Sequence, residues 1–322
     1  MRNVAAILGL SLMTAVSSRG EERSVTIARL TVTVWSSDTS APATARPVIV
    51  FSHGFHGCST QSRFLMQAFA AAGYLILAPN HRDATCGEDR ARWMSRPTLP
   101  FRRPESWSDA TYRDRADDIR RLLEAIRLDD RFRTQGDWSR VALAGHSLGG
   151  YTVLGSTGAW QSWKIGDVKA VLALSPYTEP FLRRDALGAL AAPVMYQGGS
   201  RDYGITPALR RRQGAFDQSP SPKYYVEFRN AGHFAWTDLS RVAHDEIVTY
   251  SLAFMNRYVK DTPADPVLTR ALPGVTAFRF SSERGRNPRA PDDGCIARFS
   301  ALALSLSAAP PACGGMTPRP PR

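Results

Sequence analysis

Cysteine is scarce in this sequence, with four residues in 322. No two of them are separated by only two residues, which argues against a C-x-x-C redox motif and against a zinc site built from such pairs. An even number of cysteines fits an oxidising compartment. The four are Cys58, Cys86, Cys295 and Cys313.

Long hydrophobic runs are also lacking. The apolar run from Val4 to Val16 is too short to cross a bilayer, which takes about 20 residues. Ala15 and Ser17 occupy small-residue positions at its end, so residues 1–17 resemble a secretory signal peptide. We expect export to a periplasm or out of the cell. The alternative is an apolar first strand or leader, because Arg2 is the one basic residue before the run.

Acidic residues are outnumbered, with 29 Asp and Glu against 41 Lys and Arg, which gives a formal net charge of +12. This excess could favour anionic surfaces or acidic substrates, but a solvated, arginine-rich surface is the simpler interpretation. The sequence has no zinc-finger spacing and no basic heptad array, so we expect no nucleic-acid partner.

Short apolar runs alternate with helical patterns along most of the chain. Residues 24–35 alternate as a half-buried edge strand does, and 47–52 form a continuous apolar run that predicts a central strand. Further strands are expected at 74–78, 141–144, 168–174, 194–196 and 224–228. Strands that alternate with helices predict the α/β class, with a mostly parallel central sheet and helices on both faces.

One catalytic domain is expected over residues 24–260. The connection from Arg82 to Ser108 is long but that from Ser175 to Ala191 is short, so we expect no large lid. Residues 261–322 form an extension, and from Ser281 onward it is rich in Pro and Arg, a composition typical of disorder.

The strongest motif directly follows the predicted strand 141–144 and precedes a helical pattern. Strand, G-x-S-x-G and helix together indicate a nucleophile elbow with Ser147 at its tip. The sharp turn strains the serine backbone, so the positions two residues to each side must lack bulk. The motif reads Gly145-His146-Ser147-Leu148-Gly149-Gly150.

A serine hydroxyl needs a base to take its proton and an acid to orient that base. In a fold of this kind the chain order is serine, acid, histidine. Asp202 and His233 follow predicted strands in that order, and His233 alone among six histidines has the right place. Glu179 and Asp238 remain alternatives for the acid.

A developing oxyanion needs backbone N–H donors, one from the residue after the nucleophile and one from the loop after an earlier strand. Leu148 supplies the first. The glycine-rich loop from Ser52 to Gly57 fits the second, and we expect the Phe55 N–H to donate. The alternative is that this loop is only a turn.

Cys58 follows that loop and Cys86 follows the next strand, so both lie at one edge of the sheet. This placement predicts a disulfide at the rim of the site. Cys295 and Cys313 could pair within the tail or stay free.

Histidine and cysteine near the same loop could also be interpreted as zinc ligands, but no carboxylate pattern completes a catalytic metal site. We expect no metal and no other cofactor. The residues concerned are His53, His56, Cys58 and His81. Three aromatic residues could line an acyl pocket or pack in the core: Tyr151, Tyr177 and Trp236.

Taken together, the segment His53-Gly54-Phe55, the elbow, Asp202 and Gly232-His233 resemble the α/β-hydrolase superfamily over about residues 25–259. The sequence looks like the lidless esterase branch that includes platelet-activating-factor acetylhydrolases, dienelactone hydrolases, chlorophyllases and bacterial cutinases. This resemblance implies Ser147 as nucleophile, His233 as base, Asp202 as its orienter and an oxyanion hole from the Phe55 and Leu148 amides. The tail from Ser281 matches no segment of these families.

The expected function is hydrolysis of small-molecule or lipid esters through an acyl-enzyme intermediate. Two alternatives remain, a peptidase or amidase that uses the same triad, and a binding protein that has kept the fold without catalysis. Acyl preference depends on pocket depth, which packing sets and fold analogy does not give.

Overall fold

The computed structural model describes residues 21–37, 44–86, 96–97 and 99–282. The expected signal peptide, Cys295, Cys313 and the tail from residue 283 onward lie outside these described residues. Among the described helices, none is both long and apolar enough to cross a membrane.

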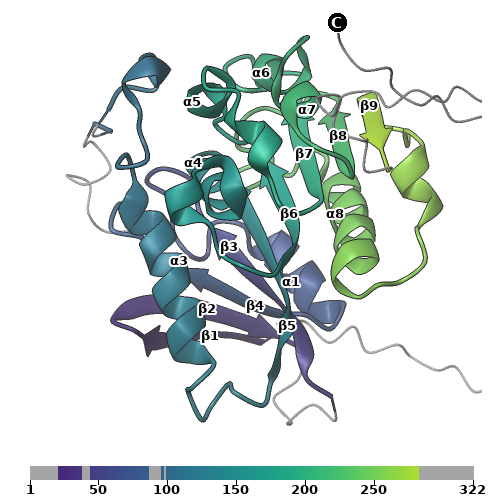
Figure 1. The fold of residues 1–322 in the computed structure, drawn as a ribbon. Helices are drawn as coiled ribbons and strands as arrows, with labels where there is room; N and C mark the ends of the chain where they lie inside the picture. Colours follow the sequence, from purple (N-terminus) through teal and green to yellow (C-terminus); the bar gives the residue numbers. More distant parts are fainter. Residues whose placement is uncertain (1–20, 38–43, 87–95, 98, 283–322) are drawn as a thin grey trace, which may run out of the picture. The chain divides into compact units, whose positions relative to one another are not determined.

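A mixed sheet of nine strands forms the centre of the described chain (Figure 1). The strands are β1 (Glu21–Ile27), β2 (Leu30–Ser36), β3 (Arg46–Ser52), β4 (Leu75–Pro79), β5 (Gly136–His146), β6 (Val168–Leu174), β7 (Val194–Gly199), β8 (Lys223–Phe228) and β9 (Val275–Ser281). Their order is β1-β2-β4-β3-β5-β6-β7-β8-β9. Neighbours from β4 to β8 are parallel, and the pairs at the two edges are antiparallel. The predicted α/β class with a mostly parallel sheet is confirmed.

Helices cover both faces of this sheet (Figure 1). They are α1 (Arg63–Ala71), α3 (Arg113–Ile126), α4 (Leu148–Leu154), α5 (Glu179–Leu182), α6 (Thr206–Arg210), α7 (Ala215–Gln218) and α8 (His244–Val259). Short helical turns are η1 (Pro104–Ser106), η2 (Gly155–Ala159), η3 (Gln161–Trp163), η4 (Ala186–Ala189) and η5 (Pro266–Thr269).

Successive side chains of a strand point to opposite faces, and the central strands divide their apolar residues accordingly. Val48 and Val50 of β3 belong to a core that α3 and α4 cover, whereas Ile49 and Phe51 belong to a core that α1 and α8 cover. Because both faces are buried, the central strands are continuous apolar runs, which is why the sequence reveals them.

The predicted single edge strand over residues 24–35 was wrong, because β1 and β2 form a hairpin. Ala28 and Arg29 make the turn with φ of 50° and 65°. Two successive left-handed residues match the twist of the flanking strands, but glycine and asparagine usually fill these positions. The sequence has neither glycine nor asparagine at these two positions, so the alternation of apolar and polar residues gives no sign of the turn.

The predicted end of the domain at residue 260 was also too early. After α8, the chain passes through η5 and returns as β9, which pairs antiparallel with β8 and closes that edge of the sheet. Gly274, with φ of 91°, leads into the strand. The folded unit therefore includes residues up to Ser281.

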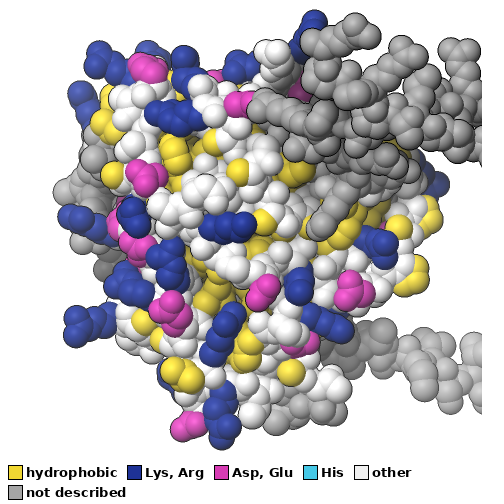
Figure 2. Space-filling model, in the orientation of Figure 1, with side chains coloured by type: hydrophobic (Ala, Val, Ile, Leu, Met, Phe, Trp, Pro, Cys, Tyr) yellow, Lys and Arg dark blue, Asp and Glu magenta, His cyan; other side chains and the backbone are white. Residues whose placement is uncertain are grey.

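Basic side chains are spread over the face drawn in Figure 2, with fewer acidic ones among them. Some form ion pairs at the surface, such as Arg63 with Glu22 at 2.8 Å and Arg279 with Asp217 at 2.6 Å. Exposed pairs of this kind contribute about 0–1 kcal/mol each. The dispersed charge favours the interpretation of a solvated, arginine-rich surface.

Candidate active site

Ser147 lies at the turn between β5 and α4. Its backbone has φ 54° and ψ −115°, a conformation that is costly for any residue with a side chain. The neighbouring glycines allow the chain to pack this tightly. A Cβ added at Gly149 would lie 1.9 Å from the Ser52 carbonyl oxygen, and one at Gly145 would lie 2.3 Å from the Gly149 carbonyl oxygen. The glycines of the motif are therefore a packing requirement.

The structure brings Ser147, Asp202 and His233 together from three separate loops. His233 Nε2 lies 2.9 Å from Ser147 Oγ, and His233 Nδ1 lies 3.0 Å from Asp202 Oδ2. The Asp202 side chain is buried, with 4% exposed, while that of His233 is 29% exposed. A carboxylate at Nδ1 keeps a proton on that nitrogen, so the lone pair of Nε2 can accept the serine proton.

Ser175 joins this group, although the sequence analysis did not select it. Its hydroxyl donates to Asp202 Oδ2 and lies 3.0 Å from His233 Nδ1. Ser175 directly follows β6, beside the strand that carries Ser147. Its place immediately after a buried strand was the signal that could have found it.

The two alternative acids have other partners in the described structure. Glu179 forms an ion pair with Arg211 at 3.1 Å. Asp238 accepts backbone N–H bonds from Arg63 at 3.1 Å and Phe64 at 3.3 Å, at the start of α1. These contacts leave Asp202 as the carboxylate bonded to the His233 ring.

His146, inside the elbow, supports the loop that carries His233. Its Nε2 donates to the His233 carbonyl oxygen at 2.8 Å, and its Nδ1 lies 3.2 Å from Gln61 Nε2, which donates to it. Burial, and then the neighbouring His233, lower the pKa of His146 to about 3. His146 therefore stays neutral and acts as a fixed hydrogen-bonding spacer.

The loop after β3 lies directly against the nucleophile. A Cβ added at Gly54 would lie 3.5 Å from Ser147 Cβ. The Gly54 N–H donates to Gln61 Oε1 at 3.0 Å, and the Gly54 carbonyl accepts the Gly57 N–H at 3.0 Å. Phe55 lies at the tip of this turn, and within the described residues its N–H has no acceptor. Leu148 is the first residue of α4, so its N–H has no intrahelical acceptor.

Comparison with known proteins agrees with this geometry. Residues 49–299 match the model of the alpha/beta hydrolase family. The chain belongs to this family. Residues 5–90 also match the model of platelet-activating factor acetylhydrolase, isoform II.

This hydrolase is similar to two curated proteins, cutinase est1 and cutinase est2 of Thermobifida alba. Each is 25% identical over 215 residues, which is 66% of this chain and 60% of the relative. The chain thus spans less than two thirds of the length of these relatives. The predicted resemblance to the acetylhydrolase and cutinase-like branch is confirmed.

Core packing, rather than a substrate pocket, accounts for two of the three predicted pocket residues of the hydrolase. Tyr151 and Trp236 are fully buried. The Tyr151 hydroxyl donates to the Thr111 carbonyl, and the Trp236 ring N–H donates to Gln197 Oε1. Tyr177 is 5% exposed, and its backbone N–H donates to the Ser147 carbonyl oxygen at 3.1 Å. The Tyr151 backbone N–H donates to the same Ser147 carbonyl oxygen, also at 3.1 Å.

The predicted disulfide between Cys58 and Cys86 is not formed, since both are free thiols. Cys58 Sγ lies 3.1 Å from Thr60 Oγ1, and Cys86 Sγ donates to Asn80 Oδ1 at 3.3 Å. Burial and the adjacent Cys58 raise the pKa of the Cys86 thiol to about 12.

Two of the histidines near this loop, His53 and His81, use their ring nitrogens within the protein. His53 Nε2 accepts the His81 backbone N–H at 3.0 Å, and the His81 ring bonds Ser52 and Asp118. His56 stacks on the Phe55 ring with centroids 3.7 Å apart. Among the described residues, no cluster of three His, Cys, Asp or Glu could hold a metal ion.

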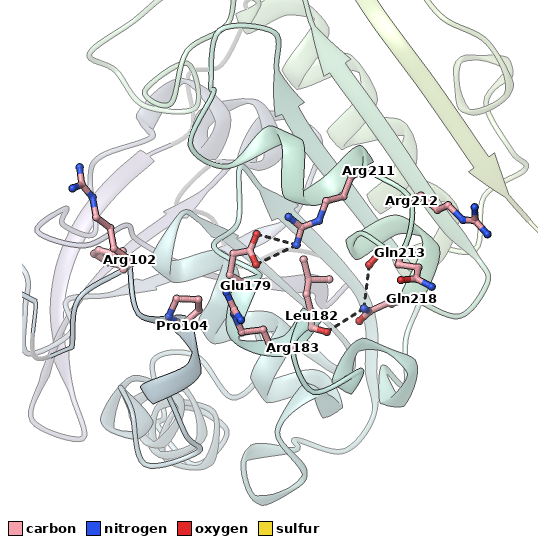
Figure 3. A pocket seen from close by; sticks show the side chains of 10 residues that line it. Arg102, Pro104, Glu179, Leu182, Arg183, Arg211, Arg212, Gln213 and Gln218 are labelled. Carbon is pink, nitrogen blue, oxygen red and sulfur yellow. Dashed lines mark hydrogen bonds and ion pairs between the residues drawn. The ribbon is translucent and has the colours of Figure 1, made fainter.

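A hollow of about 550 Å³ lies between α5, the end of α6 and the segment at η1 (Figure 3). Four arginines and one carboxylate line it, namely Arg102, Arg183, Arg211, Arg212 and Glu179. Phe101 also lines it, and the Phe101 ring packs 5.8 Å from that of Phe55 and 5.0 Å from that of Tyr177. Phe101 thus connects the basic hollow with Phe55 and with Tyr177, whose N–H donates to the Ser147 carbonyl.

Proposed function

We propose that this protein is a serine hydrolase that cleaves carboxylic esters, with Ser147 as nucleophile, His233 as general base and acid, and Asp202 as the residue that orients His233. The observation that carries the proposal is the unbroken chain from Ser147 Oγ through His233 to Asp202, with distances of 2.9 and 3.0 Å. The names of the similar proteins, cutinase and acetylhydrolase, support an ester as the substrate class.

In the first step, His233 Nε2 takes the Ser147 proton while Oγ attacks the ester carbonyl carbon. The resulting oxyanion lies between the N–H groups of Phe55 and Leu148, and each such donor is typically worth about 3 kcal/mol. His233 then gives its proton to the leaving alcohol, and the acyl group stays on Ser147.

In the second step, a water molecule gives a proton to His233 and attacks the acyl-enzyme. The acid leaves, and the proton on Nε2 returns to Ser147 Oγ. The Ser175 hydroxyl, which donates to Asp202, helps to hold its carboxylate in line with the ring.

The test is the initial rate of hydrolysis of p-nitrophenyl esters from acetate to palmitate, with Ser147→Ala as background. We expect the wild type to exceed the variant by about 10⁴-fold or more. The peak of the series would separate a preference for short esters from one for lipid-like chains.

Equal rates for wild type and variant on every ester would refute ester hydrolysis. In that case, cleavage of p-nitroanilides would indicate an amidase or peptidase. Failure of a fluorophosphonate probe to label Ser147 would instead indicate a binding protein. We also propose that residues 1–17 direct export, which cleavage of the leader in a secreting host would test.

A further inference from the structure

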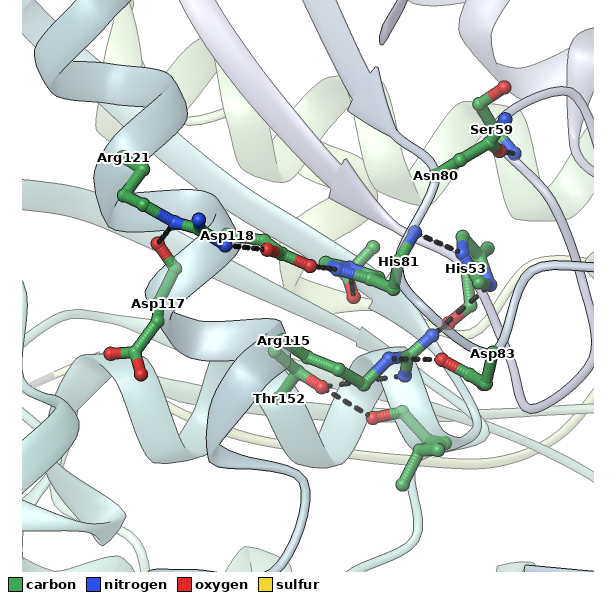
Figure 4. Close-up of polar contacts among 12 residues, drawn as sticks. His53, Ser59, Asn80, His81, Asp83, Arg115, Asp117, Asp118, Arg121 and Thr152 are labelled. Atoms are coloured by element: carbon green, nitrogen blue, oxygen red, sulfur yellow. Dashed lines mark hydrogen bonds and ion pairs between the residues drawn. The ribbon is translucent and has the colours of Figure 1, made fainter. Parts of the chain in front are cut away.

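Arg115, from the first turn of α3, is completely buried beneath the loop that carries Phe55 (Figure 4). Its Nε lies 3.2 Å from Asp83 Oδ1, and the Asp83 side chain is 16% exposed. Burial lowers the pKa of Arg115, but a guanidinium remains charged at neutral pH. A cation in this position is costly unless its other N–H groups find acceptors.

The acceptors that Arg115 finds are carbonyl oxygens of the loop. Arg115 Nη2 donates to the His53 carbonyl at 2.7 Å and lies 3.5 Å from the Gly54 carbonyl. Nη1 reaches Thr152 Oγ1 of α4 at 3.5 Å. A single buried cation thus connects the loop after β3 with the helix that follows the nucleophile.

The Gly54 carbonyl oxygen has further donors on the same side. The His53 ring Nδ1 donates to it at 2.7 Å, and the Gly57 N–H at 3.0 Å. The His53 tautomer follows from the other ring nitrogen, because Nε2 accepts the His81 N–H and so cannot carry a proton. Burial, and then Arg115, hold the pKa of His53 well below its usual value, so the ring stays neutral.

This carbonyl shares one peptide group with the N–H of Phe55. The peptide group is planar and almost always trans, so its N–H points opposite to its C=O. Donors that fix the Gly54 oxygen therefore also fix the direction of the Phe55 N–H. They also polarise the group, because hydrogen bonds along a chain strengthen one another.

We propose that Arg115 is a positioning residue of the oxyanion hole. Its guanidinium holds the carbonyl side of the His53–Phe55 turn and polarises the Gly54–Phe55 peptide, so that the Phe55 N–H binds the transition-state oxyanion more strongly than it binds the ester carbonyl. This inference rests on the proposed function, and it concerns kcat rather than substrate binding.

The purely structural alternative is that Arg115 only pairs with Asp83 inside the fold. A buried ion pair is weak evidence for stability, because apolar residues of similar volume often replace one at little cost. The contact at 3.5 Å with the Gly54 carbonyl, next to the 2.7 Å bond to the His53 carbonyl, points beyond that alternative, because the Gly54 carbonyl shares its peptide group with the Phe55 N–H.

The experiment compares an oxygen ester with its thionoester, in which C=S replaces the carbonyl. Sulfur is a weak hydrogen-bond acceptor, so the ratio of the two kcat/KM values reports on the oxyanion donors. The variants are Arg115→Met, combined with Asp83→Asn so that no lone carboxylate is buried, and Arg115→Lys. Arg120→Met is the control, because Arg120 lies on the same helix and pairs with the surface residue Asp117 at 2.7 Å.

We expect the double variant to lose about tenfold in kcat on the oxygen ester, a part of the ~10²–10³ that removal of a whole donor costs. KM and the thionoester rate should change little, so the ratio should fall by the same factor. The ratio should fall by less in Arg115→Lys, and the ratio of Arg120→Met should match that of the wild type. If the double variant does not fold, Arg115→Lys decides.

Three outcomes would overturn the inference. An unchanged ratio in a folded Arg115 variant would show that the cation does not act on the oxyanion. An equal loss on both esters would show a general structural defect, which a lower Tm would accompany. A wild type no faster than Ser147→Ala would refute the proposed function and this inference with it, which distinguishes the two failures.

Discussion

Two Ser-His-Asp arrangements occur among the residues that the structure describes, and their distances are nearly identical. We call the first, at the candidate active site, the rim set: His233 lies 2.9 Å from Ser147 Oγ and 3.0 Å from Asp202 Oδ2. We call the second, inside the protein, the buried set: His81 Nε2 lies 2.9 Å from Ser52 Oγ, and His81 Nδ1 lies 3.0 Å from Asp118 Oδ2. Hydrogen-bond geometry alone does not distinguish them.

Their surroundings differ in every property that catalysis requires. Ser147 lies on a strained turn beside the proposed oxyanion donors, and the His233 side chain is 29% exposed. Ser52 ends a central strand, and both Ser52 and the His81 side chain are buried, so no substrate can reach them. A triad of this geometry therefore becomes a candidate catalyst only where access and oxyanion donors accompany it.

Electrostatics also make His81 a poor base. Burial, and then Arg115, hold the pKa of His81 well below its usual value. Burial also raises the pKa of Asp118. A histidine that resists protonation cannot take a serine proton, so the buried set serves to hold β3, the segment after β4 and α3 together (Figure 4).

The largest expected difference lies between the two serines. Ser147→Ala should reduce kcat by about 10⁶-fold, as loss of a nucleophile does, whereas Ser52→Ala should stay within about threefold of the wild type. Hydrolysis of the preferred p-nitrophenyl ester measures both, and a fluorophosphonate probe should label Ser147 only. Labelling of Ser52, or comparable losses of kcat in both variants, would contradict this difference between the two serines.

Substitution of Asp202 should also lower kcat more than substitution of Asp118, but the factor should be smaller than for the two serines. Asp202→Asn should lower kcat by about 10⁴-fold, because the amide favours the wrong tautomer of His233. Asp118→Asn keeps an acceptor for the His81 N–H and mainly loses the charge that faces Arg121, so we expect a stability loss of about 1 kcal/mol and near-normal kcat. Steady-state kinetics and urea unfolding of both variants provide the test.

Substitution of Gly149, which lies at the contact between the two sets, should lower both stability and kcat. A Cβ on Gly149 would lie 1.9 Å from the Ser52 carbonyl, so Gly149→Ala must push α4 away from β3. We expect a loss of about 1–3 kcal/mol in stability, with a lower kcat because both N–H donors move. Gly166→Ala is the matched control, since no atom lies within 4 Å of its added Cβ. Equal Tm values for the two variants would contradict this packing argument.

The rim set was predictable from sequence because its signals are local. An apolar strand followed by G-x-S-x-G marks Ser147, and strand-end positions in the right chain order mark Asp202 and His233. The parallel core was visible for a similar reason, since strands buried on both faces are apolar throughout. The hairpin at Ala28 and Arg29 was not, because residues unsuited to left-handed backbone make its turn.

The buried set was hidden because polar residues in a charged helix look solvent-exposed. Helix α3 contains five arginines and aspartates before its first large apolar residue, Ile119, and composition does not show which of them is inside. Helical spacing did offer a clue, because Arg115 precedes Ile119 by four residues and Leu122 by seven, on the face that packs against the sheet. Tertiary contacts, which no local pattern encodes, decide the rest.

The last prediction concerns the pH dependence of stability, and it belongs to one buried histidine, His146. Burial lowers the pKa of His146 to about 3, while the unfolded chain titrates near 6.5. Between these values the unfolded state binds more protons, so stability falls as the pH drops from about 6.5 toward 3, by up to about 1.4 kcal/mol per pH unit for this group. Between pH 6 and 4, the free energy of urea unfolding of His146→Gln should depend less steeply on pH than that of the wild type, by the slope that one proton contributes. Above pH 7 the two curves of free energy against pH should run parallel. A wild-type slope that His146→Gln leaves unchanged would mean that His146 titrates in the folded protein as it does in the unfolded chain, which would contradict the effect of burial on this ring.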